Sequence, residues 1–202
     1  MAFVIPDDLA PEAYPLAWLL GRWHGEGVVA YPGIEETVVT QDVVFDHDGG
    51  PYLRYESTLR LVVAPDDGSA LVPGPDGEVQ AVDGSAPGPV WSTETGYWRV
   101  SPERDLALPA DRHPLEVLLT DPAGHLSLYV GSTGNGRVDL VSDLIARTSS
   151  AAEITAATRM YGYVQGELMW AWDLAAFGQG LQSYASARLS RVEAADDDGQ
   201  DV

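Results

Sequence analysis

The sequence predicts an all-β protein: a ten-stranded antiparallel up-and-down β-barrel with one short helix near its N-terminus. Three observations favour this fold class. From Gly21 onward, apolar residues recur with a period of two. Turn residues recur roughly every 8 to 15 positions, which is typical of an antiparallel meander. Closing such a meander on itself removes its exposed edges, and a barrel of this size can enclose a ligand cavity.

The first expected element is the short helix. The segment PEAYPLAWLLG carries Leu16, Leu19 and Leu20 around Trp18 at near-helical spacing, and Gly21 follows as a helix stop. The sequence therefore predicts a short helix immediately before the first strand.

The segment 51–62 shows the period-two pattern of the strands. Leu53, Tyr55 and Leu59 fall on one face, and charged residues alternate with them on the other, as in a half-buried strand. The ten predicted strands lie near 21–31, 35–47, 51–62, 89–100, 115–120, 125–132, 137–147, 154–163, 167–177 and 181–191.

Two irregular segments, 64–88 and 101–114, interrupt the strands. Because the strand pattern resumes after each, we interpret both as surface insertions in one domain that spans residues 1–191. The final segment, 192–202, is acidic and has no aromatic residue, so we interpret it as a disordered tail.

Composition and charge exclude several function classes. The formal net charge of −20 should repel phosphate backbones and anionic lipid surfaces, so neither a nucleic acid nor a membrane is expected as a partner. The chain has no Cys, which excludes disulfides and thiolate ligands. Its first residues lack the regions of a signal peptide, so we expect a cytoplasmic protein. The sequence leaves the oligomeric state open.

The stretch 21–27 places one large ring among three glycines: Gly21, Trp23, Gly25 and Gly27. On a strand, these four residues share one face. An inward Trp23 would close the floor of the barrel, while Gly25 and Gly27 would let the strand bend and leave open space above the ring. The same pattern is also compatible with ordinary core packing.

This motif resembles the G-x-W-x-G-x-G signature of the nitrobindin family, which comprises heme-binding barrels similar to lipocalins and fatty-acid-binding proteins. Further segments agree in order: YPGI at 31–34, FDHDGGPYL at 45–53, ETGYW at 94–98, IARTSSAAEIT at 145–155 and GQGLQSYASARLSR at 178–191. The resemblance implies a barrel that holds heme b through a histidine on its last strand. It also implies ferric heme that binds nitric oxide and isomerises peroxynitrite to nitrate.

The iron-ligand position of the family differs in this chain. Where the family has G-Q-P-L-Q-x-H-L, the chain reads GQGLQSYA, so Tyr184 stands at the proximal histidine and is the one candidate cofactor-binding residue. Ser92 and Asp121 replace two other family histidines, and Gly33 replaces a threonine. A phenolate can ligate ferric heme, usually beside a cation that lowers the phenol pKa. Arg188 lies four residues on in the same strand, roughly 13 Å away along the chain, and is not an obvious partner for this role.

The orientation of Tyr184 is ambiguous from the sequence. Alternation groups Leu181, Ala185 and Ala187 on the apolar face and points Tyr184 outward. The resemblance points Tyr184 into the cavity. We follow the resemblance and expect an inward side chain.

No other catalytic or metal-ligating arrangement is predicted. His24, His47, His113 and His125 form no pair at metal-ligand spacing; we expect His24 to face outward and His47 to bond across its turn. No nucleophile motif is present either, so no catalytic residue is assigned.

Three functions remain open. The first is a family member with a degenerate heme site, which binds little or no heme b, holds another small apolar ligand and is not an enzyme. The second is a ferric heme b protein, ligated by Tyr184, that binds nitric oxide or isomerises peroxynitrite. The third is a structural or partner-binding barrel. The missing histidine favours the first and third, whereas the glycines of the motif favour the first and second.

Overall fold

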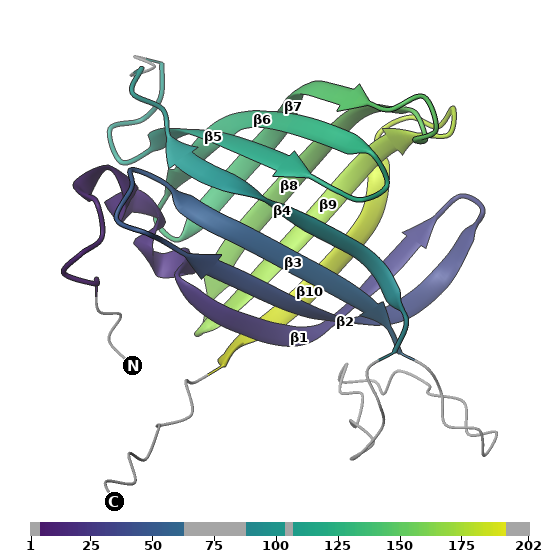
Figure 1. Ribbon diagram of the computed structural model, residues 1–202, viewed down its shortest axis with the longest axis horizontal. Helices are drawn as coiled ribbons and strands as arrows, with labels where there is room; N and C mark the ends of the chain where they lie inside the picture. The colour runs from purple at the N-terminus through teal and green to yellow at the C-terminus, as the bar shows by residue number, and fades with distance from the viewer. Residues whose placement is uncertain (1–4, 63–87, 104–106, 193–202) are drawn as a thin grey trace, which may run out of the picture.

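The computed structural model describes residues 5–62, 88–103 and 107–192, whose ten strands close into one antiparallel barrel (Figure 1). Consecutive strands pair with one another, and β1 pairs with β10 to close the ring. The strands are β1 Gly21–Tyr31, β2 Ile34–Asp46, β3 Leu53–Leu61, β4 Val90–Val100, β5 His113–Thr120, β6 His125–Gly134, β7 Arg137–Arg147, β8 Ile154–Val164, β9 Glu167–Ala176 and β10 Gln182–Val192. The predicted fold class is confirmed, and no predicted strand end is displaced by more than two residues.

Strand β3 explains why the period-two pattern is a reliable guide here. Leu53, Tyr55 and Leu59 are buried, whereas Arg54 and Glu56 between them are exposed. An antiparallel barrel has one packed face and one solvated face, and a regular strand such as β3 alternates between them. The predicted insertion at 64–88 and the predicted tail beyond Val192 fall almost entirely outside the described residues.

The predicted helix is present as η1, a 3-10 helix over Pro11–Leu19 that lies across one end of the barrel (Figure 1). Its buried residues Ala13, Leu16 and Leu19 are three apart. A 3-10 helix has three residues per turn, so these side chains share one face and cover the barrel end. Pro15 lies inside the helix and lacks a backbone N–H, which suits this short, irregular form.

Trp23 joins η1 to the barrel. Its side chain is 1% exposed, and its Nε1 donates a hydrogen bond of 2.8 Å to the carbonyl oxygen of Leu19. The Arg191 guanidinium lies 4.1 Å from the centre of the Trp23 ring and donates to the carbonyl oxygen of Trp18. The expected position of Trp23, inward at the closed end of the barrel, is confirmed.

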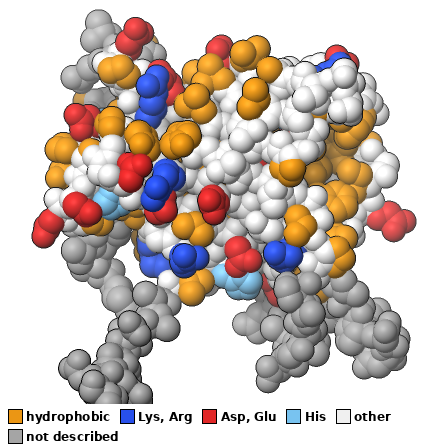
Figure 2. All heavy atoms as spheres, in the orientation of Figure 1, with side chains coloured by type: hydrophobic (Ala, Val, Ile, Leu, Met, Phe, Trp, Pro, Cys, Tyr) orange, Lys and Arg blue, Asp and Glu red, His pale blue; other side chains and the backbone are white. Residues whose placement is uncertain are grey.

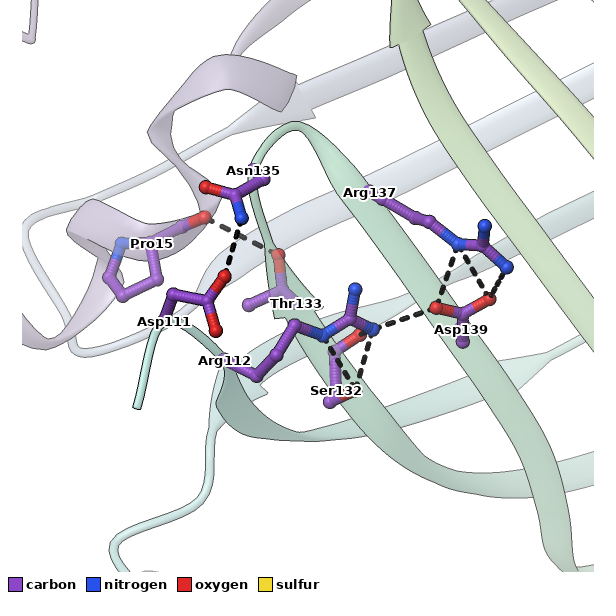
Figure 3. Close-up of polar contacts among 8 residues, drawn as sticks. All are labelled: Pro15, Asp111, Arg112, Ser132, Thr133, Asn135, Arg137 and Asp139. Atoms are coloured by element: carbon purple, nitrogen blue, oxygen red, sulfur yellow. Dashed lines mark hydrogen bonds and ion pairs between the residues drawn. The ribbon is translucent and has the colours of Figure 1, made fainter. Parts of the chain in front are cut away.

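The insertion predicted at 101–114 is fastened to the barrel by its last residues (Figure 3). The Arg112 guanidinium donates to the carbonyl oxygen of Ser132 on β6 (3.1 Å) and to the carboxylate of Asp139 on β7 (2.7 Å). Asp111 accepts a hydrogen bond of 2.6 Å from the side chain of Asn135. These contacts hold the chain beside β6, and β5 begins two residues earlier than the sequence predicts.

The outer surface carries charged side chains of both signs between apolar ones, as Figure 2 shows for one face. Neighbouring strands are linked there by exposed pairs, such as Arg54 with Asp46 (2.7 Å) and His24 with Asp42 (2.8 Å). His24 therefore faces outward, as predicted. Among the described residues, no helix has the length and hydropathy needed to span a membrane.

Candidate ligand cavity

A cavity of about 550 Å³ lies inside the barrel mouth, at the end opposite η1. Its wall comes mainly from the start of β4, the end of β9, the start of β10 and the turn between β5 and β6. The aromatic residues that line it are Trp91, Trp172, Phe177 and Tyr184, and the polar ones are Ser92, Thr93, Glu94, Asp121 and His125. Its volume and mixed lining are those of a small-molecule site.

A larger hollow of about 690 Å³ lies on the outer surface of β8, β9, β10 and β1. The partly exposed Met160 and Met169 line it, and its Arg188 is paired with Glu167 on the neighbouring strand. The inner cavity combines an apolar wall with buried ionised groups, so it is the stronger candidate for a specific site.

A β-bulge in β10 directs Tyr184 into the mouth cavity. The pairing of β10 with β9 shifts between Ser183 and Ala185, while the partner residues Asp173 and Trp172 are consecutive. Tyr184 is thus the extra residue of the bulge, and a bulge changes the side-chain alternation of its strand. Its ring lies 4.9 Å from that of Trp172, edge to face. The inward orientation of Tyr184 is confirmed. Alternation predicts an outward side chain because it assumes a strand without a bulge.

The Tyr184 hydroxyl is held by an indole across the cavity. Trp91 Nε1 donates a hydrogen bond of 2.9 Å to the Tyr184 oxygen. Burial raises the pKa of the Tyr184 phenol above its ordinary value of about 10. The Trp91 hydrogen bond and the charge of Arg159 lower that pKa, and the charge of Glu94 raises it, with burial the largest influence. The phenol is therefore neutral at physiological pH.

A buried ion pair lies beside the cavity. Arg159 on β8 is 3% exposed, and its Nη1 donates to Glu94 Oε2 at 2.8 Å, with a second contact from Nη2 to Oε1. The guanidinium also lies 4.0 Å from the centre of the Trp172 ring and 5.2 Å from that of Tyr129. Arg159 is thus held between aromatic faces and a carboxylate that lines the cavity.

Arg159 is not among the residues predicted from the sequence, because it is distant from Tyr184 along the chain. The barrel brings β8 close to β10 through β9, so residues separated by 25 positions meet in one site. One signal was available in the sequence. Arg159 shares a strand face with Ala157 and Tyr161, both buried, and a charged residue on an apolar face indicates a paired internal charge.

Packed side chains fill the barrel between the cavity and η1. Trp98 is fully buried, and its ring lies 5.2 Å from Phe45 and 5.0 Å from Tyr161. Trp170 Nε1 donates to Gln41 Oε1 at 2.6 Å, which satisfies a polar group inside this packed region. These side chains occupy the part of the barrel interior that lies between the mouth cavity and η1.

The expectation of open space at Gly25 and Gly27 is wrong. A Cβ added at Gly25 would overlap the backbone of Arg188, and one added at Gly27 would overlap the backbone of Ser186 and the Cβ of Ala187. Both glycines belong to the seam where β1 pairs with β10. They allow a close approach of the two backbones, which is another established use of glycine in a strand.

Gly27→Ala is accordingly expected to lower the free energy of unfolding by about 1–3 kcal/mol, because the overlap involves backbone that cannot move aside cheaply. Urea denaturation measures the effect. Gly180→Ala is the matched control: an added Cβ there meets nothing within 4 Å, so the change should stay within about 0.5 kcal/mol. Equal stability of both variants would contradict the close-approach role of Gly27.

The histidine at the cavity rim has both ring nitrogens engaged. His125 Nδ1 lies 3.0 Å from a carboxylate oxygen of Asp121, and its Nε2 lies 2.9 Å from the carbonyl oxygen of Ala152. These contacts link the β5–β6 turn to the β7–β8 turn. Both ring nitrogens of His125 are therefore directed at oxygens of the protein.

The remaining histidines lie away from the cavity. The ring of His47 is at the η1 end, with Nε2 3.8 Å from the Asp8 carboxylate; the expected bond across its own turn is wrong, because the ring faces the N-terminal segment instead. His113 is the exposed first residue of β5. Within the described ranges, no group of three or more His, Cys, Asp or Glu side chains could hold a metal ion.

Comparisons with known proteins identify what the chain resembles. A family model described as a THAP4-like, heme-binding β-barrel domain matches residues 12–191. A ferric nitrobindin-like protein of Beutenbergia cavernae is 49% identical over 95% of this chain and 100% of its own length. A peroxynitrite isomerase of Clavibacter sepedonicus is 38% identical over 94% of this chain and 98% of its own. The crystal structure of Rv2717c from M. tuberculosis matches with a TM-score of 0.68 and 29% identity, covering 92% of this chain and 99% of that one.

Proposed function

The chain belongs to the family of THAP4-like, heme-binding β-barrels, and from that membership we propose that it is a nitrobindin-like barrel with a degenerate heme site. On this proposal the chain coordinates no heme iron through a side chain and holds a small apolar ligand in its mouth cavity instead. It therefore lacks the activity for which the relatives named peroxynitrite isomerase are named.

The state of Tyr184 carries this proposal. Iron coordination requires a phenolate oxygen with a lone pair directed at the metal. Here the Tyr184 oxygen accepts a hydrogen bond from Trp91 Nε1, and burial raises the pKa of the phenol. Burial favours the neutral phenol. The Trp91 hydrogen bond lowers the phenol pKa, but it occupies the oxygen that iron would need.

The other donor groups of the cavity do not fit heme iron either. His125 uses both ring nitrogens on Asp121 and Ala152. The Glu94 carboxylate is engaged by Arg159 through two contacts. His125 and Glu94 are thus both engaged by partners inside the protein.

One observation favours the rival in which Tyr184 ligates heme. The positive charge of Arg159 acts on Tyr184 and lowers the pKa of the phenol, as an activating cation should. Glu94 offsets that effect, because it pairs with the same guanidinium and raises the pKa of Tyr184. The hypothesis of tyrosinate ligation therefore has a cation near Tyr184, but Glu94 already neutralises the charge of that cation, Arg159.

A comparison of hemin with metal-free protoporphyrin IX tests the proposal. If the protein supplies no iron ligand, both compounds should bind the native chain weakly and with similar affinity, and Tyr184→Phe should leave both affinities unchanged. Absorption titration measures each affinity. Stoichiometric hemin binding that is far tighter than porphyrin binding, and that Tyr184→Phe abolishes, would establish the tyrosinate-ligated rival. Failure of every small apolar probe to enter the cavity would favour a structural or partner-binding barrel.

A further inference from the structure

Three aromatic side chains form a continuous wall of the mouth cavity. Trp91 is bonded to the Tyr184 hydroxyl, and the Tyr184 ring meets the Trp172 ring edge to face at 87°. Phe177 and Ile34 extend this apolar lining. Flat unsaturated rings gain contact area and favourable edge or stacked geometries against such walls. The wall therefore suits a flat ligand.

The two carboxylates around this wall are already in use. The Glu94 carboxylate accepts two hydrogen bonds from Arg159, and the Asp121 carboxylate is in contact with His125 Nδ1. A ligand that brings only hydrogen-bond donors would have to compete with these partners. Donor-rich ligands are thus disfavoured.

Donor groups, in contrast, are in surplus. The Tyr184 oxygen accepts from Trp91, while its own proton has no acceptor among the hydrogen bonds of the described residues. Among the described residues, Trp172 Nε1 and Arg159 Nε are also buried without a hydrogen-bond partner. Polar hydrogens left unpaired in a buried site carry a cost that an acceptor relieves. Trp172 and Tyr184 are both partly exposed and both line the cavity, whereas Arg159 does not line it. The Trp172 Nε1 atom is itself buried, so the Tyr184 hydroxyl is the donor that a ligand would meet first.

The charge balance of the site selects against ions. Arg159 and Glu94 neutralise each other, so a carboxylate finds no uncompensated positive charge at this pair, and an organic cation would meet Glu94 only beside the Arg159 charge. The other lining carboxylate, Asp121, is already in contact with His125. Transferring an unpaired ion from water to such an apolar cavity is costly. A neutral ligand avoids that cost.

Together these features point to one ligand class. We propose that the mouth cavity binds a neutral, flat, unsaturated molecule with a hydrogen-bond acceptor, such as a quinone or aryl ketone oxygen, which receives the Tyr184 hydroxyl proton. This inference rests on the proposed function, because it names the ligand class of the same cavity.

The test uses two probes of the same ring size on the intact native chain. 2-Methyl-1,4-naphthoquinone carries acceptor oxygens, and 2-methylnaphthalene carries none. The chain has no Cys or Lys side chain that would add covalently to the quinone. Equilibrium dialysis measures both affinities. The ratio of quinone affinity to 2-methylnaphthalene affinity reports the proposed hydrogen bond from the Tyr184 hydroxyl.

Tyr184→Phe should weaken quinone binding about three- to tenfold, the effect of one neutral hydrogen bond, and leave 2-methylnaphthalene binding unchanged. Trp91→Phe removes the other partner of this hydroxyl but keeps the Tyr184 proton, so it should preserve the native affinity ratio. Tyr97→Phe, whose half-exposed ring lies outside the cavity lining, is the matched control. As a third probe, anionic 2-naphthoate should bind more weakly than the quinone.

An affinity ratio that Tyr184→Phe leaves unchanged would overturn the ligand class, as would 2-naphthoate binding more tightly than the quinone. If 2-methylnaphthalene still binds in either case, the proposed apolar cavity stands and only the acceptor inference falls. If neither neutral probe binds the native chain, both the inference and the proposed function fail.

Discussion

Tyr184→His is expected to raise the affinity for hemin by at least about tenfold, because even an outer-shell partner of a metal ligand changes metal affinity by about that factor. The bulge already points residue 184 into the mouth cavity. A neutral imidazole carries the lone pair that a phenol of raised pKa does not provide, and it predominates at pH 8 because the ordinary histidine pKa is about 6.5. Absorption titration should show a histidine-ligated ferric heme spectrum.

Trp91 decides how large this gain will be. Its Nε1 donates to the oxygen of Tyr184 in the native chain, and the same N–H can donate to the acceptor nitrogen of a histidine placed there. A lone pair that accepts from Trp91 is not free for iron. The double variant Tyr184→His with Trp91→Phe should therefore bind hemin more tightly than the single variant.

Two controls make this prediction falsifiable. Tyr184→Phe with Trp91→Phe opens the same space without adding a ligand, so its hemin affinity should stay at the native level. Circular dichroism verifies that each variant retains its strand content. If both histidine variants fold but bind hemin no better than this control, the identity of residue 184 is not the limiting defect, and the shape of the cavity itself has departed from a heme site.

The fold was predictable because its determinants are local. Alternation such as that of Leu53, Tyr55 and Leu59 needs only one strand to be recognised, and the turn residues between strands are equally local. Closure of the sheet into a barrel was predictable from the number of strands and from the cost of leaving edge strands unpaired. The helix was predicted in place but not in type, because the three-residue spacing of Ala13, Leu16 and Leu19 is close to that of an α-helix.

The site was less predictable because its determinants join distant strands. Alternation assigned Tyr184 to the outer face, since it assumes a regular strand and the bulge at Ser183 and Ala185 breaks that regularity. The pairing of Arg159 with Glu94 spans 65 positions and depends on barrel closure. The role of Gly27 depends on how closely β1 approaches β10, a distance that no single segment encodes.

Glu94→Gln is expected to lower the free energy of unfolding by about 3–5 kcal/mol, because it leaves the Arg159 charge buried without a counter-charge. Arg159 is 3% exposed and sits against the ring faces of Trp172 and Tyr129, so water reaches it poorly. Urea denaturation near pH 7 measures the change. Glu167→Gln removes the carboxylate partner of Arg188 on the outer surface, where the guanidinium is solvated, and should cost less than about 1 kcal/mol.

The double variant Arg159→Met with Glu94→Gln separates two effects on stability: the loss of the ion pair and the burial of an unpaired charge. Removing both charges leaves no uncompensated ion, so the double variant should be more stable than Glu94→Gln alone. Methionine also keeps an apolar, polarisable chain against Trp172. If Glu94→Gln is as stable as the native chain, polar groups other than Glu94 must solvate the guanidinium, and Arg159 would then carry an uncompensated positive charge beside the cavity. That outcome would also weaken the case for a neutral ligand, because an anion would then find a counter-charge at the cavity wall.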